Sequence, residues 1–354
     1  MIFTFTQSKR GLSLRNLLRQ FKKLKAHIKD QALIKKLFFG VLASVIFCSS
    51  AAAELTPSQK TAKDSGIALF RQSDWYDSQP PLNIAAEAGD SEAQYYLGEA
   101  IRLSNRYTTA EAQKWYEAAA KQGSLYAMLR LSNEEDLCGV MGTCSGKTAA
   151  EWREQVLEKA NERAEKGDTE AMTVLFTAGQ GLSWLEKASE AGDSYAQQLL
   201  ASVYKSGGGW FFIPGSREKA IARWFKSSSE GGNPRGMFFY ANYLFDNNGD
   251  MKEIAHWIRQ AAESGHIDSV STYAGKLSRP DNELGVTFNL KEAYGLNLLL
   301  SRIKSGTAPR DAKRNIPELE KRMTPEEIKE GIEFAKTWKE SHPPLSYFDP
   351  IYGY

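Results

Sequence analysis

The most reactive side chains in the sequence are its three cysteines, and two of them, Cys138 and Cys144, have only five residues between them. Thiols this close in a loop with two glycines can pair in an oxidising compartment, or they can supply two ligands to a metal ion. A metal site needs further ligands, and no histidine lies near the cysteines in the sequence. The spacing therefore favours a Cys138–Cys144 disulfide, with no metal site and no cofactor.

Residues that could bind phosphate or cleave a bond do not form a complete motif. Gly146-Lys147-Thr148 ends like a phosphate-binding loop, but that motif needs a glycine where the chain has Met141. The sequence also holds no Gly-x-Ser-x-Gly elbow and no His-Glu-x-x-His helix. We therefore expect a protein without catalytic residues that is not an enzyme.

The elements that position all other side chains follow from a repeated pattern. Four tryptophans stand eight residues before a glycine: Trp115, Trp184, Trp224 and Trp257 precede Gly123, Gly192, Gly232 and Gly265. Two further glycines, Gly89 and Gly167, share the surrounding register. The residue after the glycine is usually of a helix N-cap type, at Asp90, Ser124, Asp168, Asp193 and Asn233. The fourth residue after it is small, at Ala93, Ala127, Ala171, Ala196, Gly236 and Ser269.

A glycine that ends one helix and a cap that starts the next predict a helix–turn–helix unit. Repetition at a spacing of 20–50 residues is typical of stacked arrays. We therefore predict an all-α fold, an α/α solenoid of five to six helix pairs with terminal capping helices. Trp184 and Ala188 are four residues apart and therefore share a helix face, and the same is true of Trp257 and Ala261. We therefore expect both tryptophans on the buried side of their helices.

Two stretches carry a resemblance to a known family. The segment Ala85–Gly98 and the segment Trp184–Gln197 resemble the core motif of Sel1-like repeats, and the resemblance covers roughly residues 80–303. It implies a superhelix related to tetratricopeptide (TPR) arrays that serves as a binding scaffold and has no catalytic residues. The unit around Gly167 departs from the motif, with Lys159 in place of tryptophan and Phe176 in place of a small residue, so we expect a distortion there.

The two ends of the chain differ from the array. We predict a leader at 1–53, an N-terminal cap at 54–79, the array at 80–303, and a C-terminal cap helix with an aromatic tail at 304–354. Thr324, Pro325 and Glu327 form a capping-box pattern, which predicts a helix to about Glu340. From about Gly285 the chain resembles an uncharacterised extension that follows such repeats in some exported bacterial proteins.

The leader predicts export. Lys35-Lys36 precedes an apolar run from Leu37 to Cys48, and Ala51 and Ala53 supply a small-residue cleavage site, as in a secretory signal peptide. We expect cleavage near Ala53, location in the periplasm, and no stable membrane span afterwards. An uncleaved anchor is the alternative, although the run is short for a membrane span. The remaining 35 basic and 42 acidic residues carry a net charge of −7, which argues against a nucleic-acid partner.

Two aromatic clusters are candidate partner-binding sites. One consists of Trp210, Phe211 and Phe212 in a glycine-rich loop, and the other lies in the tail, at Tyr347, Phe348, Tyr352 and Tyr354. In each case the rings either pack on the array or are presented to a partner protein.

The expected function is protein binding without catalysis. Exported proteins with Sel1-like repeats include immunity proteins that neutralise secreted antibacterial toxins such as phospholipases, so the resemblance suggests a toxin or effector enzyme as the partner. An envelope scaffold or regulatory adaptor is the alternative. A cell-wall hydrolase, or a β-lactamase-like enzyme as claimed for some cysteine-rich relatives, is less favoured because this chain has a single cysteine pair after the leader.

Overall fold

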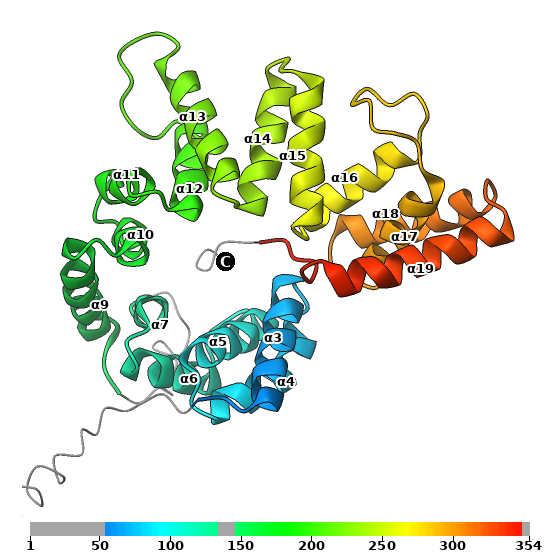
Figure 1. Cartoon of the computed structure of the whole chain (residues 1–354). Helices are drawn as coiled ribbons and strands as arrows, with labels where there is room; N and C mark the ends of the chain where they lie inside the picture. The colour runs from blue at the N-terminus through cyan, green and yellow to red at the C-terminus, as the bar shows by residue number, and fades with distance from the viewer. Residues whose placement is uncertain (1–53, 134–145, 349–354) are drawn as a thin grey trace, which may run out of the picture. The chain divides into compact units, whose positions relative to one another are not determined.

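The computed structural model describes residues 54–133 and 146–348, which belong to one compact unit that begins at Ala52. These residues form sixteen α-helices and no strand, so the prediction of an all-α solenoid is confirmed. The helices follow one another as stacked pairs (Figure 1). Their bounds are α3 (Pro57–Arg71), α4 (Trp75–Glu87), α5 (Ser91–Asn105), α6 (Ala110–Lys121), α7 (Leu125–Leu131), α9 (Ala149–Glu165), α10 (Thr169–Thr177), α11 (Leu182–Glu190), α12 (Ser194–Lys205), α13 (Ser216–Glu230), α14 (Pro234–Asp246), α15 (Met251–Glu263), α16 (Ile267–Leu277), α17 (Leu290–Ser301), α18 (Thr307–Glu320) and α19 (Pro325–Ser341).

Six of the turns between helices repeat one geometry. In each, the junction glycine has a positive φ between 82° and 95°, which L side chains rarely adopt. The following side chain then accepts a hydrogen bond from the backbone N–H three residues ahead, as Asp90 does from Ala93 at 2.8 Å. The five predicted caps all do this, and His266 takes the sixth cap position through its Nδ1. The predicted helix–glycine–cap–helix unit is therefore confirmed.

Small residues let the paired helices approach closely. The predicted small positions, from Ala93 to Ser269, are all buried. A Cβ atom on Gly236 would stand only 2.2 Å from the Ser228 Oγ of the paired helix, so no larger residue fits there. The tryptophans divide into two kinds. Trp115 and Trp224 are buried, whereas Trp184 and Trp257 are half-buried and lie at the edge of the core.

The divergent unit keeps the common junction. Gly167 has a φ of 90°, and Asp168 caps α10 as its equivalents do in other units. Lys159, which stands where other units have a tryptophan, is exposed, and the buried tryptophan of α9 is Trp152, two turns earlier. Arg163 replaces a small residue and pairs with Asp168 at 2.7 Å. The distortion expected from these substitutions is therefore absent from this junction.

The terminal helices follow their capping signals. Thr324 and Glu327 form the predicted capping box, and α19 ends at Ser341, one residue beyond the expected end, because His342 is already extended. At the other end, a second capping box at Thr56 starts α3. The predicted boundary at 79/80 falls inside α4, and the division of the chain into caps and array remains a prediction.

The segment after α19 returns to the end of α3. The Leu345 carbonyl accepts a hydrogen bond from the Gln72 side chain at 3.0 Å, and the Tyr347 N–H donates to the Arg71 carbonyl at 3.0 Å. Ser346 also exchanges backbone hydrogen bonds with Gly265 and Ile267 at the α15–α16 junction. This segment therefore links the end of α3 to the α15–α16 junction.

Candidate protein-binding surface

One loop presents large apolar side chains to solvent. Residues 207–215, here called the finger, connect α12 to α13 and extend beyond both helices (Figure 1). The Trp210 side chain is 89% exposed and the Phe212 side chain is 90% exposed, and Ile213 beside them is also exposed. Exposed apolar clusters of this kind mark interaction sites, because leaving such rings in water costs free energy that a partner can recover.

Arg217 holds the base of the finger in place. Its guanidinium donates hydrogen bonds to the backbone carbonyls of Tyr204 at 3.0 Å and Gly209 at 3.2 Å, and also to that of Gly208. It stacks over the Phe211 ring at 4.6 Å, and that ring meets Tyr204 edge-on at 4.9 Å. A loop that is fixed before binding loses less conformational entropy when a partner docks.

The structure thus divides the three predicted finger residues. Phe211 packs against α12 and anchors the loop, whereas Trp210 and Phe212 point away from the array. The two alternatives left open by the sequence, packing and presentation, therefore hold for different residues. Binding of a partner by this surface remains a prediction.

The described tail residues contact the array itself. The Tyr347 hydroxyl donates to the Ser305 carbonyl at 2.8 Å, and the Phe348 ring stacks on His266 with the ring centroids 6.2 Å apart. Burial, together with the charge of Arg235, lowers the pKa of His266 to about 3, so this ring is neutral at ordinary pH. Tyr352 and Tyr354 lie outside the described residues, and the partner-binding role of the tail remains a prediction.

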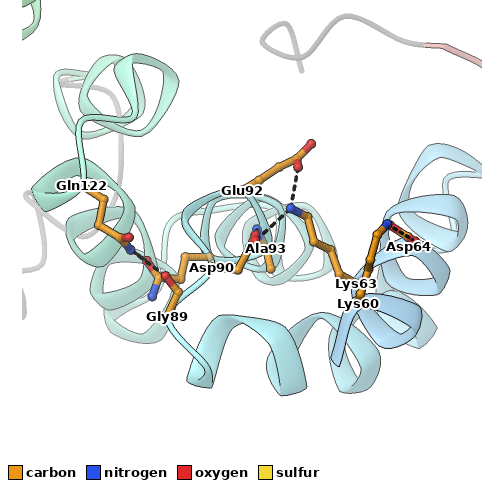
Figure 2. Close-up of polar contacts among 9 residues, drawn as sticks. Lys60, Lys63, Asp64, Gly89, Asp90, Glu92, Ala93 and Gln122 are labelled. Atoms are coloured by element: carbon orange, nitrogen blue, oxygen red, sulfur yellow. Dashed lines mark hydrogen bonds and ion pairs between the residues drawn. The ribbon is translucent and has the colours of Figure 1, made fainter. Parts of the chain in front are cut away.

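Charged residues tie α3 to the first repeat junction. The Lys63 Nζ lies 2.9 Å from Asp90 Oδ2 and 2.8 Å from Glu92 Oε2, while Asp90 also caps α5 (Figure 2). Next to this group, a cavity of about 460 Å³ lies between α3 and the segment that follows α19. Because Lys63 already has two carboxylate partners, the cluster serves the packing of α3 rather than offering an open anion site.

A buried charge cluster was not identified from the sequence. The Glu99 side chain is 2% exposed and forms an ion pair with Arg130, itself 4% exposed, at 2.7 Å. Arg102 lies 2.9 Å from the other carboxylate oxygen, and the Tyr116 hydroxyl donates to Glu99 at 2.8 Å. Burial and the charge of Glu99 raise the pKa of Tyr116 well above its usual range, so the phenol stays a neutral donor.

This cluster joins three helices, because its members lie on α5, α6 and α7. It is enclosed, and its charges are paired, so it offers structural linkage and no access for a substrate. A sequence signal did exist: Glu99 follows Tyr95 and Tyr96 by one helical turn, which places a carboxylate on the apolar face of a helix.

A metal site and a membrane-spanning helix each have requirements that the described part of the chain does not meet. Among residues 54–133 and 146–348, no group of three His, Cys, Asp or Glu side chains could hold a metal ion. None of the helices in those ranges is long and apolar enough to cross a membrane. Cys138, Cys144 and the leader lie outside the described residues, so the disulfide and the cleavage site remain predictions.

The described residues define a helical-repeat solenoid with an exposed aromatic finger. No protein-family model matches the chain, and no curated protein matches it. It is similar to a solved structure of c5321, a protective antigen present in uropathogenic Escherichia coli strains and displaying an SLR fold, at 19% identity and a TM-score of 0.45. That match covers 82% of this chain, which spans only 63% of the length of c5321.

Two further solved structures are similar to the chain. A Sel1 repeat protein from Oxalobacter formigenes matches at 19% identity and a TM-score of 0.38, covering 70% of this chain and 98% of that one. The immunity protein PA5088 from Pseudomonas aeruginosa matches at 16% identity and a TM-score of 0.33, covering 68% and 86%. The first two of the three are SLR or Sel1 repeat proteins by name, the class that the motif at Ala85–Gly98 resembles.

Proposed function

We propose that this chain is a non-catalytic, protein-binding solenoid that works in the periplasm as an immunity protein. It would bind and neutralise a secreted antibacterial toxin, such as a phospholipase, that reaches the envelope. The observation that carries the protein-binding part is the finger, whose Trp210 and Phe212 are exposed while Arg217 holds their loop in one conformation.

The size of the finger fits a role as an interface anchor. Aromatic side chains bury ~150–250 Å² each, so Trp210 and Phe212 could together remove ~270–450 Å² from water. A stable complex buries ~800 Å² on each partner, so the two rings would supply roughly a third to a half of that area. Such central aromatic anchors commonly dominate binding energy.

The place of action rests on the sequence. The leader has the charge, the apolar run and the small-residue end of a secretory signal peptide. An immunity protein that neutralises a toxin needs a large surface complementary to that toxin and needs no catalytic residues, which suits a repeat array. The net charge of −7 after the leader would speed capture of a basic toxin without defining its identity.

The test is competition between sibling cells. A strain lacking this gene is challenged by siblings that carry their secretion system, and survival is measured with and without a complementing copy. Exported wild-type protein should restore survival, whereas a version without residues 33–53 should not. A finger variant, Trp210→Ser with Phe212→Ser, should fail to rescue even at equal periplasmic level and equal thermal stability.

The matched control is Tyr76→Ser, which removes a 77% exposed aromatic ring from α4, away from the finger. This variant should rescue as well as wild type. Equal survival of the deletion strain and its parent would contradict the immunity role and would favour an envelope scaffold or adaptor. Full rescue by the finger variant would contradict the binding surface.

A further inference from the structure

A second cavity lies beside the finger. Its volume is about 460 Å³, and it is lined by residues of α12, α13 and α14, which contact one another. Volumes of about 300–1,000 Å³ are typical of ligand pockets. The side chains that line it and bear on its chemistry are Ser202, Lys205, Phe225, Phe239, Asn242 and Asp246.

The floor of this cavity is aromatic. The Phe225 ring is buried and meets the Phe239 ring edge-to-face, with centroids 6.0 Å apart and planes at 69°. Arg235 lies over Phe239, 5.2 Å from its centroid, and helps to hold that ring in place. A third ring entering the cavity would therefore meet the half-buried Phe239 ring, which the buried Phe225 supports from behind, in edge-to-face or offset stacking.

The rim of the cavity is polar and its charges are loosely paired. Lys205 Nζ lies 3.4 Å from Asp246 Oδ2, and both side chains are more than half exposed. Ion pairs of this kind contribute ~0–1 kcal/mol, so either group can turn to a new partner at little cost. Asn242 adds an amide, which both donates and accepts.

The rim is also continuous with the finger. Lys205 is the last residue of α12, and the finger begins two residues later, at Gly207. A partner that covers Trp210 and Phe212 would need ~350–530 Å² of further contact to reach ~800 Å². The cavity offers a concave surface for that contact.

We propose that this cavity is a pocket for one aromatic side chain with a polar tip, a tyrosine or tryptophan supplied by the partner protein. The ring would lie on Phe239, and its O–H or N–H would donate a hydrogen bond to Asp246 or Asn242 at the rim. That the ring comes from a toxin rests on the proposed function. The pocket and its preference for such a ring rest on the cavity alone.

The pocket is tested on the full-length protein with two small probes, N-acetyl-tyrosinamide and N-acetyl-tryptophanamide. Saturation-transfer NMR should show saturable binding of both, with dissociation constants of about 1 mM, as expected for ligands of this size. N-acetyl-alaninamide, which keeps the amides and lacks the ring, should not bind. Absence of saturable binding by the two aromatic probes would overturn the proposal.

Filling the cavity provides the decisive comparison. Phe239→Trp should place extra ring volume in the pocket and weaken probe binding at least tenfold. Phe245→Trp is the matched control, because it makes the same change on the same helix at an exposed ring that does not line the cavity. If Phe239→Trp does not fold, Asn242→Phe blocks the same cavity from its rim. Equal probe binding by the blocked protein and the control would overturn the proposal.

Two further outcomes separate the pocket from the function. Probe binding with no survival defect in the deletion strain would retain the pocket and reject the immunity role. A wild-type dimer, detected by light scattering and abolished by both Phe239→Trp and Trp210→Ser, would overturn the assignment to a partner protein, since the occupant would then be Trp210 of a second copy.

Discussion

Removing the Glu99 charge alone from the buried Glu99–Arg130 pair should destabilise the array at least as much as removing both charges. The two side chains are almost fully buried and share two hydrogen bonds, at 2.7 and 3.0 Å. Glu99→Gln leaves the Arg130 charge buried without a counter-charge, which typically costs about 3–5 kcal/mol. Arg130→Met should cost less, because Arg102 still lies 2.9 Å from the Glu99 carboxylate.

The double variant, Glu99→Gln with Arg130→Met, removes the Arg130 charge that Glu99→Gln alone would leave buried without a counter-charge. The oxygen of the amide that replaces the Glu99 carboxylate can still accept the hydrogen bond from Arg102, while its NH2 group can donate to the Tyr116 hydroxyl, so the double variant should be no less stable than Glu99→Gln alone. The coupling energy in this double-mutant cycle should therefore reach about 2–3 kcal/mol. Urea unfolding followed by circular dichroism measures all four proteins. Additive losses in the double variant would show that the two charges do not stabilise each other and would refute this reasoning.

Three further predictions concern burial, protonation and the finger. Trp224→Ala should lower the free energy of unfolding by about 3–5 kcal/mol, whereas Trp184→Ala, which removes a half-buried ring, should lower it by about half as much. Thermal melts measure both losses, and equal losses would contradict the difference in burial between the two rings. Because the folded-state pKa of His266 is depressed to about 3, the unfolded chain binds a proton at this residue below pH 6.5 while the folded protein does not. The contribution of the neutral His266 ring to the free energy of unfolding is therefore full above pH 6.5 and is lost as the pH falls toward 3. Between pH 7.5 and pH 5 the loss should be about 2 kcal/mol, and His266→Asn, which keeps a cap, should remove that part of the pH dependence. Arg217→Gln should speed proteolytic cleavage within residues 207–215 while leaving the melting temperature of the array nearly unchanged, and an unaltered cleavage rate would mean that other contacts hold the finger.

Much of the fold follows from the sequence because its signals are local. A glycine at φ near 90° and a cap that bonds three residues ahead act within a single turn, so Gly89 with Asp90 could be identified without knowledge of the rest of the chain. The same holds for the capping box at Thr324 and Glu327. Small residues in a constant register then predict which helix faces pack together.

The candidate sites depend on contacts between distant residues, which local patterns do not encode. The sequence identified the aromatic loop, but only the guanidinium of Arg217 on the next helix decides that Phe211 packs while Trp210 and Phe212 remain exposed. Likewise, the aromatic pocket exists because three helices meet.

The burial of single residues shows the same division. The repeat register predicts Trp184 on the packed face of its helix, but how deeply the ring is buried depends on the neighbouring units. In the structure the Trp184 ring is half-buried. Glu99 is paired only because α6 and α7 bring Tyr116 and Arg130 to it. By itself, then, the sequence determined the helices, their junctions and the packing faces. The tertiary structure decided which rings meet solvent and which charges meet each other, because these depend on side chains that are adjacent in space and far apart along the chain.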